Sequence, residues 1–332
     1  MSTSRADSDF LSPYGSPAPL VRFFGWAMLA IIVAFMINNV LIVAYDFPTL
    51  NAAFGGSDSR VWVLVAIYAA ALIVAGYWIL RTPDRALRYD ARKISAFNAY
   101  LIRGCFFSVL FIGIVDATIA FIRVEGLLPV VFSEGLAKEL IRARFIGPMI
   151  HVPLIVLGFI VAVFSRSLGF IWLALMIVLA ELLIVISRFV FSYEQALMGD
   201  LVRYWYAALF LFSSAYTLLE EGHVRVDVLY AGFDSRRKGR VNSVGSILLG
   251  MTTAWVIIVV GLGSQQAIIN SPVANFEVSQ TGTAGMFIKY QMAAFLGIFA
   301  ITMLIQFVSY LFEAVADQRD EPGRREAAAI AH

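Results

Sequence analysis

The chain has 332 residues, of which 60% are hydrophobic and only 14% charged, and its formal net charge is +2. Soluble globular domains carry roughly 25% charged residues, so this composition excludes a soluble protein. The single cysteine, Cys105, excludes an internal disulfide framework and a cysteine-based metal cluster. We predict an all-α polytopic membrane protein, because the recurring apolar runs are long enough to cross a bilayer as helices.

The N-terminal half of the sequence predicts a tail and four membrane spans. Residues 1–19 are rich in Ser, Asp and Pro and are typical of a disordered tail. Residues 20–166 are expected to form a four-helix membrane extension, with spans at about 22–44, 61–80, 97–122 and 146–165. The stretch at 125–144 is too polar to span and predicts a short interfacial helix.

The C-terminal half predicts a second four-helix membrane domain over residues 167–315. Its spans are expected at about 168–190, 203–219, 243–264 and 286–313, and a charged cytoplasmic tail follows at 316–332. About eight spans that start from a cytoplasmic N-terminus place both termini inside. The loop at 81–96 then also lies inside, and it carries five cations: Arg81, Arg85, Arg88, Arg92 and Lys93. That orientation follows the positive-inside rule, with the basic loop at 123–144 as its exception.

Two acids, Asp116 and Glu181, lie within predicted spans. A carboxylate in hydrocarbon is costly and usually faces a partner or a water path. One interpretation is coupling to an ion or proton. The other is that each acid pairs with an Arg or Asn on a neighbouring helix and locks the bundle. The second is favoured, because acids do not recur on successive spans.

A polar motif, G-H-V-R-V-D-V-L-Y, occupies residues 222–230 after the sixth predicted span, and a basic cluster follows it at 236–240. Within it His223, Arg225 and Asp227 alternate with three valines, so an extended segment separates polar and apolar faces. We interpret it as an interfacial collar at the inner surface. The alternative is a solvated loop, which does not explain the three valines.

Signals for catalysis or cofactor binding are weak. The sequence has no phosphate-binding loop of the G-x-x-x-x-G-K-[ST] type. A membrane haem needs two facing axial ligands, and the candidates His151 and His223 are predicted at opposite surfaces. Ser213, His223 and Asp227 match a hydrolase only in composition. We therefore expect a protein that is not an enzyme and that has no cofactor and no catalytic or metal site.

Residues about 168–315 resemble the DctQ-type small membrane subunit of tripartite ATP-independent periplasmic (TRAP) transporters. The resemblance consists of an arginine that closes the first span of this region, an acid three residues before Arg-Tyr, and the G-H-V-R-V-D-x-x-Y motif. The matching residues are Arg188, Asp200, Arg203, Tyr204, Gly222, His223, Arg225, Asp227 and Tyr230. The chain departs from the family at Ser213 and Glu221, where glycine is usual, and in its four N-terminal spans.

The resemblance implies a multi-pass subunit of the bacterial inner membrane with both termini cytoplasmic. Its expected partners are a large membrane subunit, which transports substrate by an elevator motion, and a periplasmic substrate-binding protein. The expected process is sodium-driven uptake of an organic acid, and the listed motif residues would serve assembly. The alternative from a different class is a membrane anchor subunit of a redox enzyme complex.

Overall fold

The computed structural model describes residues 18–52, 58–165, 170–219, 230, 232–278 and 282–323. All regular secondary structure in these ranges is helical, which confirms the predicted fold class. Seven stretches of the described residues are long and apolar enough to cross a membrane. They are α2 (Pro19–Tyr45), α4 (Val61–Arg81), α5 (Leu87–Val124), Ala143–Phe164, Ile171–Phe191 within α10 (Phe170–Phe191), Ser235–Leu262 and α15 (Lys289–Gln318).

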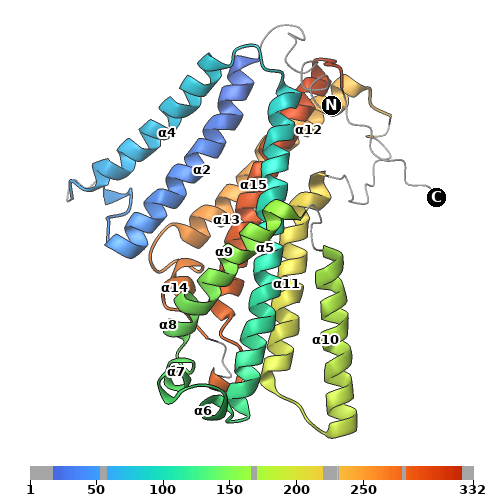
Figure 1. The fold of residues 1–332 in the computed structure, drawn as a ribbon. Coiled ribbons are helices and arrows are strands. Elements are labelled where there is room, and N and C mark those ends of the chain that lie inside the picture. The colour runs from blue at the N-terminus through green and yellow to red at the C-terminus, as the bar shows by residue number, and fades with distance from the viewer. Residues whose placement is uncertain are drawn as a thin grey trace. The chain divides into compact units, whose positions relative to one another are not determined.

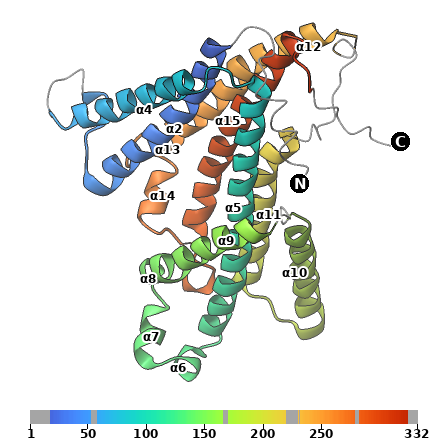
Figure 2. The same ribbon diagram turned by 45° about the horizontal axis from the view of Figure 1, so that its top comes forward.

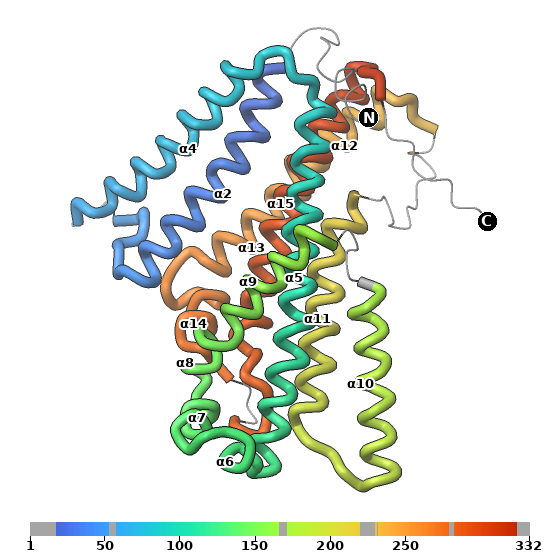
Figure 3. Tube along the Cα trace, viewed as in Figure 1, coloured from blue at the N-terminus to red at the C-terminus, as the bar shows by residue number. Residues whose placement is uncertain are grey.

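The sixth predicted span corresponds to α11 (Ala196–Leu219), a 24-residue helix that is not among these seven. Its tyrosines, serines and Trp205 interrupt its apolar residues, so it lacks a stretch as continuously apolar as those of the seven candidate spans. Two of the long stretches are composite. One joins α8 (Ala143–Ile146), the π-helical turn η1 (Gly147–His151) and α9 (Val152–Phe164), which Figure 3 traces as one run. The other joins α12 (Ser235–Gly245), η2 (Ser246–Met251) and α13 (Thr252–Leu262).

In two places the structure is helical where the sequence predicted polar residues outside the membrane spans. The loop predicted at 81–96 ends at Leu87, where α5 begins, so the third span is a 38-residue helix rather than the predicted 97–122. The first turns of α5 are polar on the sequence, but Arg88, Asp90 and Asn98 are buried, which explains why hydropathy missed them. The basic cluster at 236–240 lies on α12, which begins after an N-cap in which Asp234 accepts a hydrogen bond from the Arg237 main-chain nitrogen.

The chain divides into two compact units, and each unit draws on both halves of the sequence. The first contains residues 1–98, 215–265 and 300–332, and the second contains 99–214 and 266–299. The predicted domain boundary at residue 166 stays a prediction. In space, however, the N-terminal spans are packed with segments from the C-terminal half within each unit.

The first unit contains α2 and α4, which run antiparallel, together with α12 and α13 (Figures 1 and 2). The start of α5 and the end of α15 also belong to this unit, and buried polar side chains join α2 to α5 and α5 to α15. Arg22 of α2 pairs with Asp90 of α5 at 2.8 Å, and both side chains are only 1% exposed. Asn98 of α5 donates to the Thr302 carbonyl of α15 at 2.9 Å. The N-terminal spans are therefore integral to this unit.

The second unit is built on the C-terminal half of α5, with α9 and α11 packed against it. A Cβ atom on Gly158 of α9 would lie only 2.5 Å from the Ser108 main-chain nitrogen of α5, so the two helices are in backbone contact there. Trp205 of α11 donates to the Val109 carbonyl of α5 at 3.2 Å. The unit also contains α10 and the short helices α6 (Leu128–Val131), α7 (Glu134–Glu139) and α14 (Asn270–Ala274), of which α7 lies in the predicted interfacial stretch.

Candidate functional site

The candidate site surrounds residues 285–288, a buried stretch of irregular backbone immediately before α15. It lies in the second unit and follows the short 3-10 turn η3 (Gly282–Ala284). Irregular backbone in a membrane protein must find hydrogen-bond partners within the protein, because lipid offers none. Here charged side chains supply them.

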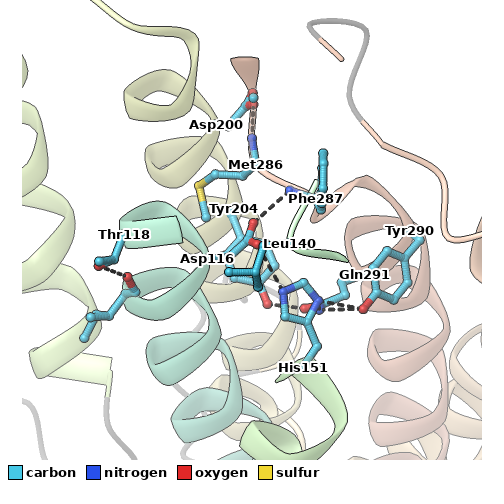
Figure 4. A network of polar contacts seen from close by, with 12 residues as sticks. Asp116, Thr118, Leu140, His151, Asp200, Tyr204, Met286, Phe287, Tyr290 and Gln291 are labelled. Carbon is cyan, nitrogen blue, oxygen red and sulfur yellow. Dashed lines mark hydrogen bonds and ion pairs between the residues drawn. The ribbon is translucent and has the colours of Figure 1, made fainter. Parts of the chain in front are cut away.

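Three charged residues from two helices bind this stretch. Arg123, at the end of α5, donates to the carbonyls of Thr283 at 2.7 Å and Gly285 at 2.6 Å. Asp200 of α11 accepts from the Met286 main-chain nitrogen at 3.1 Å, and Asp116 of α5 accepts from the Phe287 nitrogen at 2.8 Å (Figure 4). These bonds satisfy two main-chain donors and one acceptor of the stretch. The start of α15 is therefore anchored to α5 and α11.

His151 connects Asp116 to the first turn of α15. Its Nε2 atom lies 3.3 Å from Asp116 Oδ1, and both side chains are completely buried. On the other side of the ring, Nδ1 lies 2.7 Å from the Tyr290 hydroxyl and 2.8 Å from Gln291 Nε2. Figure 4 shows the imidazole between the carboxylate and these two residues.

The hydrogen-bond partners fix the tautomer of His151. The Gln291 amide is placed with Oε1 accepting from the Tyr204 hydroxyl and with its nitrogen facing His151 and Tyr290. An amide nitrogen only donates, and Nδ1 must therefore be an acceptor. The ring proton then lies on Nε2, which is 3.3 Å from Asp116 Oδ1 but is not aligned with it for a hydrogen bond. A continuous polar chain links α11, α15, η1 and α5.

The π-helical turn η1 places His151 in this chain. It contains Pro148, and Pro153 follows in α9, so two main-chain donors are missing near His151. π-helical turns are rare and occur frequently at functional sites. We call the connected residues the α15 network: Asp116, Arg123, His151, Asp200, Tyr204, Tyr290 and Gln291.

A second contact joins the loop before α11 to the end of α5. The Tyr193 hydroxyl donates to Glu125 Oε1. Partial burial and this hydrogen bond raise the pKa of Tyr193 to about 12. The phenol therefore stays protonated, and remains a donor, throughout the physiological pH range.

The structure brings three of the predicted residues together, Asp116, Asp200 and Tyr204, all in the α15 network. The partners of Asp116 are a histidine and a main-chain amide, where the sequence suggested an Arg or Asn on a neighbouring helix. Arg203 is exposed on α11. Arg188 is exposed on α10 and lies 3.5 Å from Glu194.

Glu181 is exposed near the middle of α10. Of the motif at 222–230, only Tyr230 is described; Gly222, His223, Arg225 and Asp227 lie outside the described residues. The Tyr230 hydroxyl accepts from Asn242 Nδ2 at 2.8 Å, and Lys238 Nζ lies 5.4 Å from the centre of its ring. The last residue of the motif is therefore held against α12.

Sequence reasoning missed four members of the network, namely Arg123, His151, Tyr290 and Gln291. One signal could have found part of it. Asp116 and Arg123 lie toward the end of the third predicted span, and His151 lies near the start of the fourth, so the two predicted spans place all three at a similar depth. Tyr290 and Gln291 carried no such signal, because their partners are distant in sequence.

The geometry of the α15 network suits it to hold a fold in place. Asp116, His151 and Tyr204 are each 0% exposed, so a substrate has no access to them in this arrangement. Within the described ranges, no group of three or more His, Cys, Asp or Glu side chains could hold a metal ion. Each network residue contacts another member of the network or the main chain just before α15. The site is a structural network that holds the start of α15 against α5 and α11.

The comparison with known families adds one finding. The family described as "Tripartite ATP-independent periplasmic transporters, DctQ component" matches residues 174–316. No curated protein and no solved structure matches the chain. The matched range contains α11, α12, α13 and α14 and most of α10 and α15, while α2, α4, α5 and α9 lie before it.

Proposed function

We propose that this chain, whose residues 174–316 belong to the DctQ component family of TRAP transporters, is the small scaffold subunit of such a transporter. In this role it binds a large membrane subunit that moves substrate by an elevator motion, and it helps to dock a periplasmic substrate-binding protein. The process is sodium-driven symport of an organic acid, and the subunit itself is not an enzyme. Both termini face the cytoplasm.

The observation that carries the proposal is the surface of α10. Only Leu173 and Ile177 of its described side chains are buried, at 1% and 5% exposure. Large apolar side chains are exposed along the helix, among them Ile171 at 83% and Phe189 at 78%. A membrane helix with so little contact to its own chain is suited to receive another membrane subunit.

Glu181 indicates what that subunit must offer. It is exposed near the middle of a 22-residue apolar helix. A charged side chain at the bilayer centre costs about 2.5–3.5 kcal/mol even on insertion scales. A basic or hydrogen-bond-donating side chain on the large subunit would offset this. A second copy that packed its α10 on this α10 about an axis along the membrane normal would instead bring two Glu181 side chains to the same depth.

The α15 network and the 222–230 motif fit the scaffold role in different ways. A fixed scaffold needs an internal bundle that does not rearrange while its partner moves, and the buried network supports that rigidity. We propose that the motif, held at Tyr230 against α12, is an assembly element at the inner surface.

Glu181→Leu is expected to weaken association with the large subunit by about 2–5 kcal/mol, because it leaves the partner's donor buried and unpaired. Recovery of the large subunit after affinity purification of the co-expressed complex measures this. The control Glu134→Gln removes an exposed carboxylate from α7, outside the spans, and is expected to leave recovery unchanged. Full recovery with Glu181→Leu, together with a more stable isolated chain, would mean that Glu181 faces lipid.

A further inference from the structure

Three cations at the junction of α4 and α5 have aromatic rings as neighbours. The Arg85 guanidinium lies 5.0 Å from the ring centre of Trp78 and 5.2 Å from that of Tyr89. Lys93 Nζ lies 5.5 Å from the same Tyr89 ring. Cation–π contacts orient these side chains but leave their hydrogen-bond donors available. We call this region, residues 77–93, the α4–α5 corner.

Arg81, the last residue of α4, extends the cluster. Its guanidinium lies 5.2 Å from the ring centre of Tyr77, and its Nε atom donates to the Tyr77 hydroxyl at 2.9 Å. Arg81 and Lys93 are exposed and Arg85 is half-buried. Because α4 is a candidate span that ends at Arg81, the cations lie where a membrane meets water.

No acid in the described part of the chain forms an ion pair with Arg81, Arg85 or Lys93. Two acids are near in sequence. Asp90 is buried and already accepts from Arg22 and from the Trp26 indole at 3.0 Å. Asp84 is exposed in the connecting loop and pairs with none of the three. The cluster therefore has a net positive charge that the described residues leave uncompensated.

The corner is also rigid. Arg22 donates to the Thr82 hydroxyl at 2.9 Å and to the Thr82 carbonyl, which ties α2 to the loop after α4. The ring of Trp78 packs edge-on against Trp26, with 5.9 Å between the ring centres. The aromatic surface beneath Arg85 is thus fixed by a neighbouring helix. A charged ligand would meet cations that are already oriented.

We propose that the α4–α5 corner binds the phosphate of an anionic phospholipid. Guanidinium groups match the geometry of phosphate oxygens, and an ammonium group adds a further point charge. Exposed aromatic side chains such as Tyr77, at 57% exposure, are typical of the headgroup level of a bilayer, where they flank a bound lipid. Basic clusters beside spans attract anionic lipids by about fivefold in affinity for each cation. The site lies in the N-terminal extension, outside the matched family range.

The test is titration of the full-length chain, purified in a zwitterionic detergent, with phosphatidylglycerol or phosphatidylcholine, followed by native mass spectrometry. The wild type is expected to bind phosphatidylglycerol selectively. The double variant Arg81→Gln/Arg85→Gln is expected to weaken that binding roughly 30-fold, and Lys93→Gln about fivefold. Lys93 is exposed, so its variant remains informative if the double variant does not fold.

Arg60→Gln is the matched control. Arg60 also lies over an aromatic ring, 5.4 Å from the centre of Phe47, but its charge is paired with Asp58 at 2.8 Å. The substitution Arg60→Gln removes one positive charge, as Lys93→Gln does, and is expected to leave lipid binding unchanged. The proposal is overturned if Arg60→Gln weakens binding as much as Lys93→Gln, since the effect would then be nonspecific. It is also overturned if inorganic phosphate displaces the lipid at equal concentration, because the ligand would then be a free anion.

Discussion

Alanine in place of Asp116 is expected to lower the free energy of unfolding by about 1–3 kcal/mol for the buried main-chain donor that loses its acceptor, with a further loss from the cavity that it leaves. The carboxylate is completely buried, accepts from the Phe287 main-chain nitrogen and lies 3.3 Å from His151 Nε2. Its loss leaves the Phe287 donor without an acceptor and removes one of the links between α5 and the stretch before α15. Chemical unfolding in detergent micelles measures the change.

Thr118→Ala is the control for this prediction. Thr118 is two residues further along α5, is exposed, and donates its hydroxyl only to the Ile114 carbonyl of its own helix. Its replacement is expected to change the stability by no more than about 0.5 kcal/mol. Asp116→Asn keeps the shape and one acceptor, so a loss smaller than that of alanine is expected. Equal stability of Asp116→Ala and Thr118→Ala would show that Asp116 and the α15 network do not stabilise the helix bundle.

The second large effect is expected at Arg22, in the N-terminal extension. Arg22→Leu leaves Asp90 as an uncompensated buried carboxylate and removes the bonds to Thr82, so a loss of about 3–5 kcal/mol is expected. The same unfolding measurement applies. The double variant Arg22→Leu/Asp90→Leu is expected to be more stable than the single one, because it removes both charges.

An exposed ion pair provides the comparison for Arg22. Arg236 pairs with Asp320, and these side chains are 68% and 47% exposed. Arg236→Leu is expected to change stability by about 0–1 kcal/mol, because solvent screens such pairs. If Arg22→Leu were as mild as Arg236→Leu, the extension would be an appendage and not an integral part of the first unit.

The sequence allowed the fold class and most spans to be predicted, because burial in a membrane depends on the length and hydropathy of single segments. It failed where tertiary contacts bury polar residues. The start of α5 reads as a basic loop, yet Arg88 pairs with Glu313 and with Asp317, far along the chain. Hydropathy cannot anticipate a charge that is neutralised by a distant partner.

The candidate site was predictable only in part, for the same reason. Asp200 and Tyr204 were identified by their family motif, and Asp116 by its rarity within a span. Their convergence on residues 285–288 depends on bonds between α5, α11 and α15, whose sequence separations no local pattern encodes. The position of His151 depends in addition on a π-helical turn, for which no sequence pattern was recognised.

The central claim is that this chain is a scaffold subunit of a secondary transporter. The most direct test is purification of the tagged full-length chain from its native membrane, with identification of the partners and an absorption spectrum. We predict that a second, larger and very hydrophobic membrane subunit co-purifies, without haem absorbance. A haem spectrum together with a soluble flavoprotein or iron–sulfur partner would contradict the claim and establish the redox-anchor alternative.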